Sequence, residues 1–216
     1  MTATAGSRTA VLQRIHAAVG RDAPDIGAEY DRLPRAYQLS GTQTAGDRVG
    51  LMIERLREYD ADVLECTAGN IADAISAQIK KCERRLLVAP HGLPQEWLVS
   101  GTEWRIDDGL TKEQIEECDG AVTAAECGIA DSGTIVLHHS PAEGRRLLSL
   151  LPDWHLCILR ASQVVETLPQ YFERYGPPPA LATFISGPSA TADIEMTRIK
   201  GVHGPRFLNV LMVRDE

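Results

Sequence analysis

Short apolar runs alternate with amphipathic segments from about residue 47 to the end of the chain. Runs such as Leu86–Ala89 have the length of a strand, whereas the intervening segments repeat apolar residues at helical intervals, as Val49, Met52 and Leu56 do. Strands that are covered on both faces contain continuous apolar runs, and the helices that connect parallel strands have a 3.6-residue period. The alternation therefore predicts an α/β fold with a mostly parallel sheet and helices on both faces.

The same pattern predicts the individual elements. Helices are expected over about 8–19, 47–60 and 111–118, around Ile71, Ile75 and Ile79, from Glu143 to Pro152, and after a cap at Ser162, where Pro169 should kink or break the helix. Strands are expected over 61–66, 86–89, 103–107, 120–125, 134–137, 155–159, 181–185 and 207–213, with a loop over 126–133.

The N-terminal part differs in composition from the rest of the chain. An amphipathic helix is followed by a polar stretch from Gly20 to Gly46, which contains Pro24 and Pro34. Such a stretch buries little apolar surface, so it is expected to be extended. Residues 1–45 are therefore expected to form an N-terminal helix and an extended arm, and residues 46–216 a single α/β domain.

Charge and hydropathy exclude several classes of protein. The chain has 22 Lys and Arg residues against 30 Asp and Glu residues, a net charge of −8, which disfavours binding to nucleic-acid phosphates. Its longest apolar runs fall far short of the roughly 20 residues that a membrane span needs. The N-terminal segment lacks the apolar region of a signal peptide. A soluble, cytoplasmic protein is expected, with neither a nucleic-acid partner nor a membrane span.

The cysteines predict no metal site. The five cysteines are separated by intervals of 16, 36, 9 and 30 residues, so no C-x-x-C pair exists. Iron–sulfur clusters and structural zinc sites usually take ligands from such close pairs. No cofactor or metal is therefore expected on this chain, and most of its thiols should be small buried hydrophobic groups.

Two loops contain the residue types of a ligand site. Ligands of open α/β sheets bind outside the carboxyl ends of the strands, and the loops 123–134 and 187–195 follow strands and combine carboxylates, hydroxyls and glycines. Each loop also has a structural interpretation, as an Asx-type turn and as a capped helix start, respectively. The candidate catalytic residues are Glu126, Asp131 and His203. The candidate ligand-binding residues are Ser132, Gly133, Thr134, Arg146, Gly187, Ser189, Thr191, Asp193 and Glu195.

The Arg145–Arg146 pair has two interpretations as well. An arginine can bind a carboxylate through two parallel hydrogen bonds, but a pair of arginines is more often a solvated face. The chain contains no G-x-G-x-x-G run and no Walker lysine loop, so neither a dinucleotide site nor a P-loop site is indicated.

Two pairs of motifs resemble a known family. The runs Ala130–Leu137 and Gly144–His155, followed by Ser186–Glu195 and Gly201–Pro205, are similar to the lactate-utilisation protein C family, which has a LUD domain. The resemblance implies a fold like those of ribose-5-phosphate isomerase and the coenzyme A transferases. It also implies a three-component system that oxidises L-lactate to pyruvate with iron–sulfur clusters. Within that system the chain resembles the cluster-free component, so the clusters are expected on partner subunits.

Three functions remain open at this point. The chain is an accessory or small-anion-binding subunit of the lactate-oxidising system, a stand-alone isomerase or acyl/CoA-transferase-like enzyme that uses Glu126 or Asp131, or a structural interaction module. The expected partners are iron–sulfur subunits, a small anionic ligand and, as a possibility left open, further copies of the chain.

Overall fold

The computed structural model describes residues 5–19, 26–34, 41–191, 199–200 and 204–214. The chain divides into two compact units, residues 1–37 and residues 38–216. The first unit contains α1 (Ala5–Val19) and α2 (Ile26–Arg32). The expected helix over 8–19 is thus present, but the following stretch is not wholly extended, because α2 lies within it.

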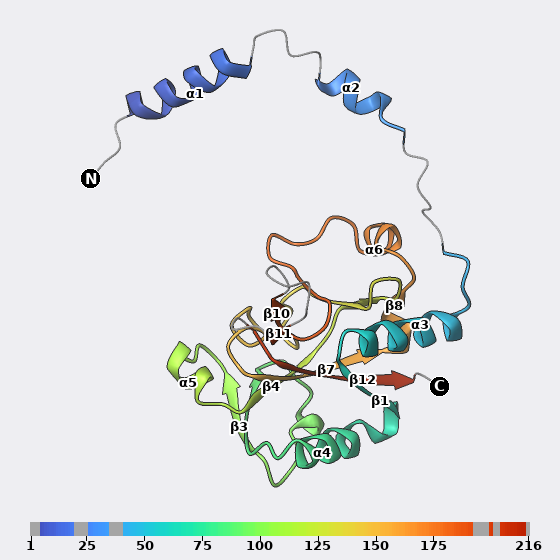
Figure 1. Cartoon of the computed structure of the whole chain (residues 1–216). Coiled ribbons are helices and arrows are strands. Elements are labelled where there is room, and N and C mark those ends of the chain that lie inside the picture. Colours follow the sequence, from blue (N-terminus) through green and yellow to red (C-terminus); the bar gives the residue numbers. More distant parts are fainter. Residues whose placement is uncertain (1–4, 20–25, 35–40, 192–198, 201–203, 215–216) are drawn as a thin grey trace. The chain divides into compact units, whose positions relative to one another are not determined.

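A six-stranded sheet forms the centre of the second unit, in the order β1-β12-β7-β4-β2-β3 (Figure 1). Every pairing in this sheet is parallel, which confirms the α/β prediction. The last strand of the chain, β12, lies between β1 and β7. The strands are β1 (Asp62–Thr67), β2 (Leu86–Pro90), β3 (Glu103–Asp107), β4 (Gly120–Ala124), β7 (Trp154–Arg160) and β12 (Phe207–Arg214).

A second sheet of four strands, in the order β8-β5-β6-β9, was not predicted. It contains antiparallel pairs, because β5 and β6 form a hairpin and β6 pairs with β9 in the antiparallel sense. The expected loop over 126–133 was wrong in part, since it contains β5. These strands are β5 (Cys127–Ile129), β6 (Thr134–Leu137), β8 (Val164–Val165) and β9 (Thr183–Ile185), and a separate pair is formed by β10 (Ala190–Thr191) and β11 (Ile199–Lys200).

The two faces of the six-stranded sheet are covered differently. Helix α4 (Ile71–Lys81) packs Ile75 and Ile79 against one face. Helix α3 (Ala45–Glu58) and the inner face of the second sheet cover the other face, where Met52 and Ile135 share a cluster of buried side chains with Val210. Figure 1 shows α3 and α4 on opposite sides of β1 and β12.

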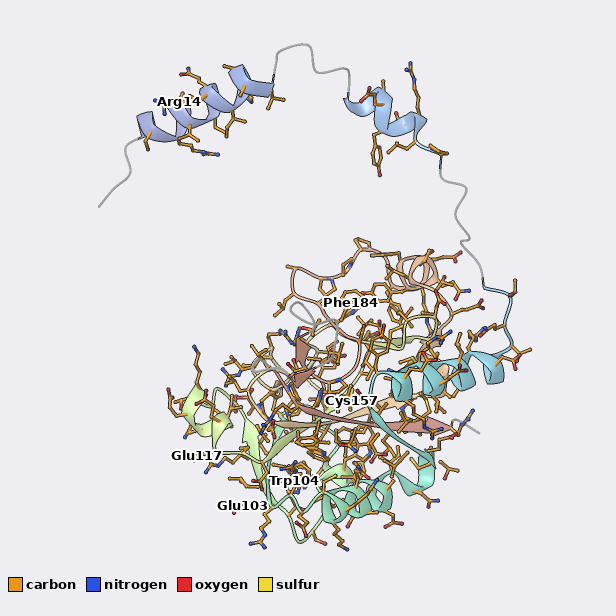
Figure 2. The ribbon with its side chains drawn as sticks, viewed as in Figure 1. Arg14, Glu103, Trp104, Glu117, Cys157 and Phe184 are labelled. Atoms are coloured by element: carbon orange, nitrogen blue, oxygen red, sulfur yellow. The ribbon has the colours of Figure 1, made fainter. Side chains whose placement is uncertain are left out.

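The outer face of the second sheet packs against α6 (Leu168–Tyr175) through the fully buried Tyr171. Side-chain sticks show Cys157 in the interior and Phe184 at this outer layer (Figure 2). The remaining elements are α5 (Lys112–Glu116) and the short 3-10 helices η1 (Ala68–Asn70), η2 (Gln95–Trp97) and η3 (Ala161–Gln163). In the described part of the chain, no helix combines the length and apolar character that crossing a membrane requires.

Two helix predictions were wrong. Residues 143–152 form consecutive turns, because Gly144 has a φ of +72° and the buried Glu143 carboxylate accepts hydrogen bonds from His138 N and Ser140 Oγ. Ser162 does not cap a helix either. Helix α6 begins after Thr167, whose Oγ1 accepts from Gln170 N, and Pro169 lies in its first turn, where proline is tolerated.

Candidate functional site

The two loops selected from the sequence meet at one end of the second sheet. The first forms the β5–β6 turn and the second begins where β9 ends, and β6 and β9 are antiparallel neighbours. The Oγ1 atom of Thr134 lies 2.7 Å from Ser186 Oγ and also 2.7 Å from Ser132 Oγ. A chain of three hydroxyls therefore connects the loops.

A cavity of about 170 Å³ lies beside this junction, between the two sheets. Its lining combines the start of β7 and of β12 with the end of β9 and the turns that follow it. The cavity thus lies at the amino ends of the six-stranded sheet, whereas the carboxyl ends were expected. Its lining residues are Arg146, Ser149, Leu150, His155, Thr183, Phe184, Ile185, Ser186, Gly187, Pro188, Ser189, Gly204, Pro205 and Leu208. Most of them belong to the motif runs quoted above, which converge here although they are distant in sequence.

Arg146 is the cationic side chain of this lining. Its Nη1 donates to Ser149 Oγ at 3.1 Å, and that hydroxyl donates to the carbonyl oxygen of Arg146 at 3.2 Å. Ser149 therefore holds the guanidinium close to the backbone of Arg146. Among the described residues no carboxylate pairs with Arg146. A half-buried guanidinium that no described carboxylate neutralises is suited to bind a carboxylate or another small anion.

The neighbouring Arg145 has a different environment. Its Nε and Nη2 donate to the two carboxylate oxygens of Asp107 at 2.7 and 2.8 Å. Burial would raise the pKa of the Asp107 carboxyl, but the hydrogen bonds from Arg145 and the Leu110 N–H outweigh it and lower this pKa. Of the two arginines, Arg145 is therefore neutralised within the protein, and Arg146 faces the cavity.

The cavity lining contains a histidine that was expected in a strand and at the end of a family motif, but not among the candidate site residues. His155 is 1% exposed, and burial lowers the pKa of its imidazole to about 4. Its Nε2 lies 2.8 Å from Oγ1 of Thr123, which is itself fully buried in β4. The signal in the sequence was a polar ring inside an otherwise apolar run.

A second cavity, of about 540 Å³, lies at the carboxyl ends of β2 and β3. It is lined by His91, by Asp107 and the two residues after it, and by the 139–145 turns. The arginine in the lining of this second cavity is Arg145, which is already paired with Asp107. None of the candidate site residues predicted from the sequence lines it, so the smaller cavity is the better candidate for an anion.

Several predicted residues lie outside the smaller cavity. Glu126 is half-buried beside α6, where its carbonyl oxygen accepts from Tyr175 Oη at 3.2 Å. Asp131 and Ser132 are exposed in the β5–β6 turn. Gly133 has a φ of +59° and packs against α3, and its N–H donates to Ala130 O. The carboxylates proposed as catalytic groups are thus not brought to the candidate site.

The second loop also differs from expectation. Residues 190–191 form a strand where a helix start was expected, and Ser189 N donates to Pro205 O. This N–H is therefore occupied within the protein and does not serve an anion in the cavity. The side chain of Thr191, together with Asp193, Glu195 and His203, lies outside the described residues.

Three of the five cysteines are buried in the protein. No group of three or more His, Cys, Asp or Glu side chains in the described ranges could hold a metal ion. Cys118, Cys127 and Cys157 are buried, and burial raises the pKa of all three thiols, to about 11 for Cys127 and about 12 for Cys157. Such thiols are poor sources of the thiolate that binds metals.

Comparisons with known proteins agree with the fold and the motifs. The model of the LUD domain matches residues 38–213. A lactate utilization protein C of Deinococcus radiodurans is 32% identical to this chain, and the alignment covers 97% of each protein. A lactate utilization protein C of Bacillus velezensis is 28% identical, and the alignment covers 100% of this chain and 99% of that protein. A crystal structure of a DUF162 family protein from Deinococcus radiodurans superposes with a TM-score of 0.66 at 29% identity, over 80% of this chain and 99% of that one. The chain therefore belongs to the LUD domain family.

Proposed function

We propose that this protein is a component of a lactate utilization system and binds a small carboxylate in the cavity between the two sheets. The observation that supports this function best is Arg146, a cation on the wall of a 170 Å³ cavity with no carboxylate partner among the described residues. Sites for drug-sized ligands occupy roughly 300–1,000 Å³, so this cavity suits a molecule of a few non-hydrogen atoms. The names of the relatives, lactate utilization protein C, supply the link to lactate.

We propose further that the chain acts with an iron–sulfur partner subunit. The support is the family resemblance, in which the shorter component lacks cluster ligands, together with the wide spacing and raised pKa values of the buried thiols. Lactate-dependent dye reduction should then require the reconstituted complex. Reduction by the purified chain alone would contradict this assignment.

Ligand binding tests the site directly. We expect calorimetric titration of the full chain to detect L-lactate and pyruvate, and the substitution Arg146→Gln to weaken both by about tenfold or more, because charge-assisted hydrogen bonds contribute about 1.5–3 kcal/mol. Arg57→Gln is the matched control, since Arg57 is an exposed arginine on α3 away from the cavity lining. Unchanged binding by the Arg146 variant would contradict the proposed site.

The stand-alone enzyme is the alternative that the same samples test. It needs a carboxylate base or nucleophile at the ligand, and neither Glu126 nor Asp131 lines the cavity. Turnover of phosphosugars or acyl-CoA esters by the isolated chain, abolished by Glu126→Gln or Asp131→Asn, would favour this alternative over the binding subunit.

A further inference from the structure

The two cavities of the second unit are neighbours, because the same chain segments line both of them. Arg145 lines the larger cavity, and Arg146 lines the smaller one. In the same way, Leu181 lines the larger cavity, and Thr183, two residues further along the chain, lines the smaller one. Their volumes are about 540 and 170 Å³, so the side chains between them limit the room that a ligand of Arg146 can occupy.

A hydrogen bond between two side chains crosses from one cavity to the other. His139, which follows β6, lines the larger cavity, and its Nε2 lies 2.8 Å from Oγ1 of Thr183, which lines the smaller one. The other ring nitrogen, Nδ1, lies 2.7 Å from the carbonyl oxygen of Gly144. A carbonyl oxygen accepts hydrogen bonds and cannot donate them, so Nδ1 carries a proton, and in the neutral ring Nε2 accepts from the Thr183 hydroxyl. Both nitrogens of the imidazole are therefore held by the protein.

The backbone of His139 is strained at the point where the ring is held. Its φ is +59°, in the left-handed region that is uncommon for a residue with a Cβ atom. Such a conformation persists where the surrounding contacts over-determine it, and here these contacts include the two hydrogen bonds of the ring. Gly144 lies two residues before Arg146, whereas Thr183 lies in β9. The imidazole thus connects the segment that carries Arg146 with the strand on which Thr183 lines the smaller cavity.

We propose that His139 and Thr183 form a partition between the two cavities, and that His139 is a residue that determines which ligand sizes the smaller cavity accepts. This inference rests on the proposed function and adds a size limit to it. With the partition in place, a carboxylate bound by Arg146 has the room of the smaller cavity. Without the imidazole, the two cavities join, and the chain of a longer carboxylate extends into the larger one.

Straight-chain carboxylates of two lengths test the partition by calorimetric titration. Each methylene that is buried on binding strengthens affinity about fourfold. We expect hexanoate to bind the wild-type protein no more tightly than propionate, because its three extra methylenes find no room to be buried. His139→Gly should bind hexanoate about tenfold or more tightly than propionate. Glycine adopts a φ of +59° without strain, so this substitution removes the ring and suits the turn. An unchanged ratio of the two affinities would overturn the partition.

Two further variants complete this experiment. His91→Gly is the matched control, because His91 also lines the larger cavity but is exposed and is not part of the partition. It should keep the affinity ratio of the wild type. Thr183→Ala removes the other half of the partition and should change the ratio in the same direction as His139→Gly. This variant covers the case in which His139→Gly does not fold, and a wild-type ratio in it would contradict the inference.

A crystal structure of His139→Gly tests the partition without any ligand. It should show one continuous cavity in place of the two described above, and two separate cavities would overturn the inference. The proposed function fails by a different result, namely that Arg146→Gln leaves the binding of propionate unchanged.

Discussion

Gly133 occupies a position that no other residue type fits. Its φ is +59°, and a Cβ atom there would lie 2.7 Å from Cβ of Arg55 and 3.0 Å from the carbonyl carbon of the same residue in α3. Replacement by alanine adds left-handed backbone strain to a clash with helix backbone. We expect Gly133→Ala to lower the free energy of unfolding by about 2 kcal/mol or more, measured by urea denaturation.

Gly50 provides the matched control within α3. It is exposed, and a Cβ atom there would meet nothing within 4 Å. Gly50→Ala should therefore raise the free energy of unfolding by about 0.5–1 kcal/mol, because alanine favours the helix and restricts the unfolded chain. Equal effects of the two substitutions would show that the β5–β6 turn does not pack against α3 as described.

His155 makes a prediction about pH. Burial lowers the pKa of its imidazole from 6.5 to about 4, so between these values the unfolded chain binds a proton that the folded chain excludes. Stability that is full above pH 6.5 is then lost as pH falls toward 4, by about 3 kcal/mol in all. We expect urea denaturation at several pH values to show this loss in wild type and a smaller one in His155→Gln. An equal slope in both proteins would contradict the buried neutral imidazole.

The site was predicted from the sequence only in part. Arg146, Gly187 and Ser189 were selected from the motif loops and line the cavity, whereas their role in binding a ligand stays a prediction. Glu126 and Asp131 were selected as catalytic candidates, but neither side chain lines the cavity. Glu126 lies beside α6, and Asp131 is exposed in the β5–β6 turn. His155 was missed because burial of a strand conceals which polar side chain faces a cavity. Pairing between distant strands supplies that information, and the local pattern does not contain it.

Helix α6 shows how local rules specify an element boundary. Thr167 Oγ1 accepts from Gln170 N, and the Gln170 side chain accepts in return from Thr167 N, so the cap is reciprocal. We expect Thr167→Ala to destabilise the protein by about 1 kcal/mol and Thr167→Ser to restore most of that loss, as judged by thermal unfolding. An unaffected alanine variant would mean that packing of Tyr171 alone sets the start of α6.

The segment 143–152 shows the opposite case, in which distant contacts override a local pattern. Its leucines repeat at helical spacing, but a Cβ atom on Gly144 would meet Leu148 Cδ1 at 2.5 Å and Pro90 Cβ at 2.9 Å. The pairing of Arg145 with Asp107, 38 residues earlier, also directs the backbone into turns. Strand β5 was missed for a related reason, since three residues around Gly128 have little pattern of their own. Most strands of the main sheet were predicted because they contain longer apolar runs, such as Leu86–Pro90 and Trp154–Arg160.

The buried apolar core described for the chain lies in the larger unit. Among the described residues, the four clusters of buried apolar side chains lie between Val49 and Val213. The segment before α3 still contributes, because Gln43 N donates to Glu166 Oε2 at 2.9 Å. We expect a chain that begins at Gln38 to keep the melting temperature of the whole protein within about 1 °C, measured by calorimetry. A drop of several degrees would show that residues 1–37 stabilise the core.

The position of β12 has a consequence for synthesis on the ribosome. Strand β1 ends at Thr67 and its neighbour β12 begins at Phe207, so about 140 residues separate their translation. At about 5–20 residues per second, β1 waits roughly 7–28 seconds without β12, its partner in the sheet. During that time the backbone N–H and C=O groups of β1 lack the eight-residue strand that pairs with them, and an unpaired strand is prone to aggregate. A premature stop codon before Phe207 would leave β1 and β7 without the strand that joins them, and such a product is a substrate for proteolysis.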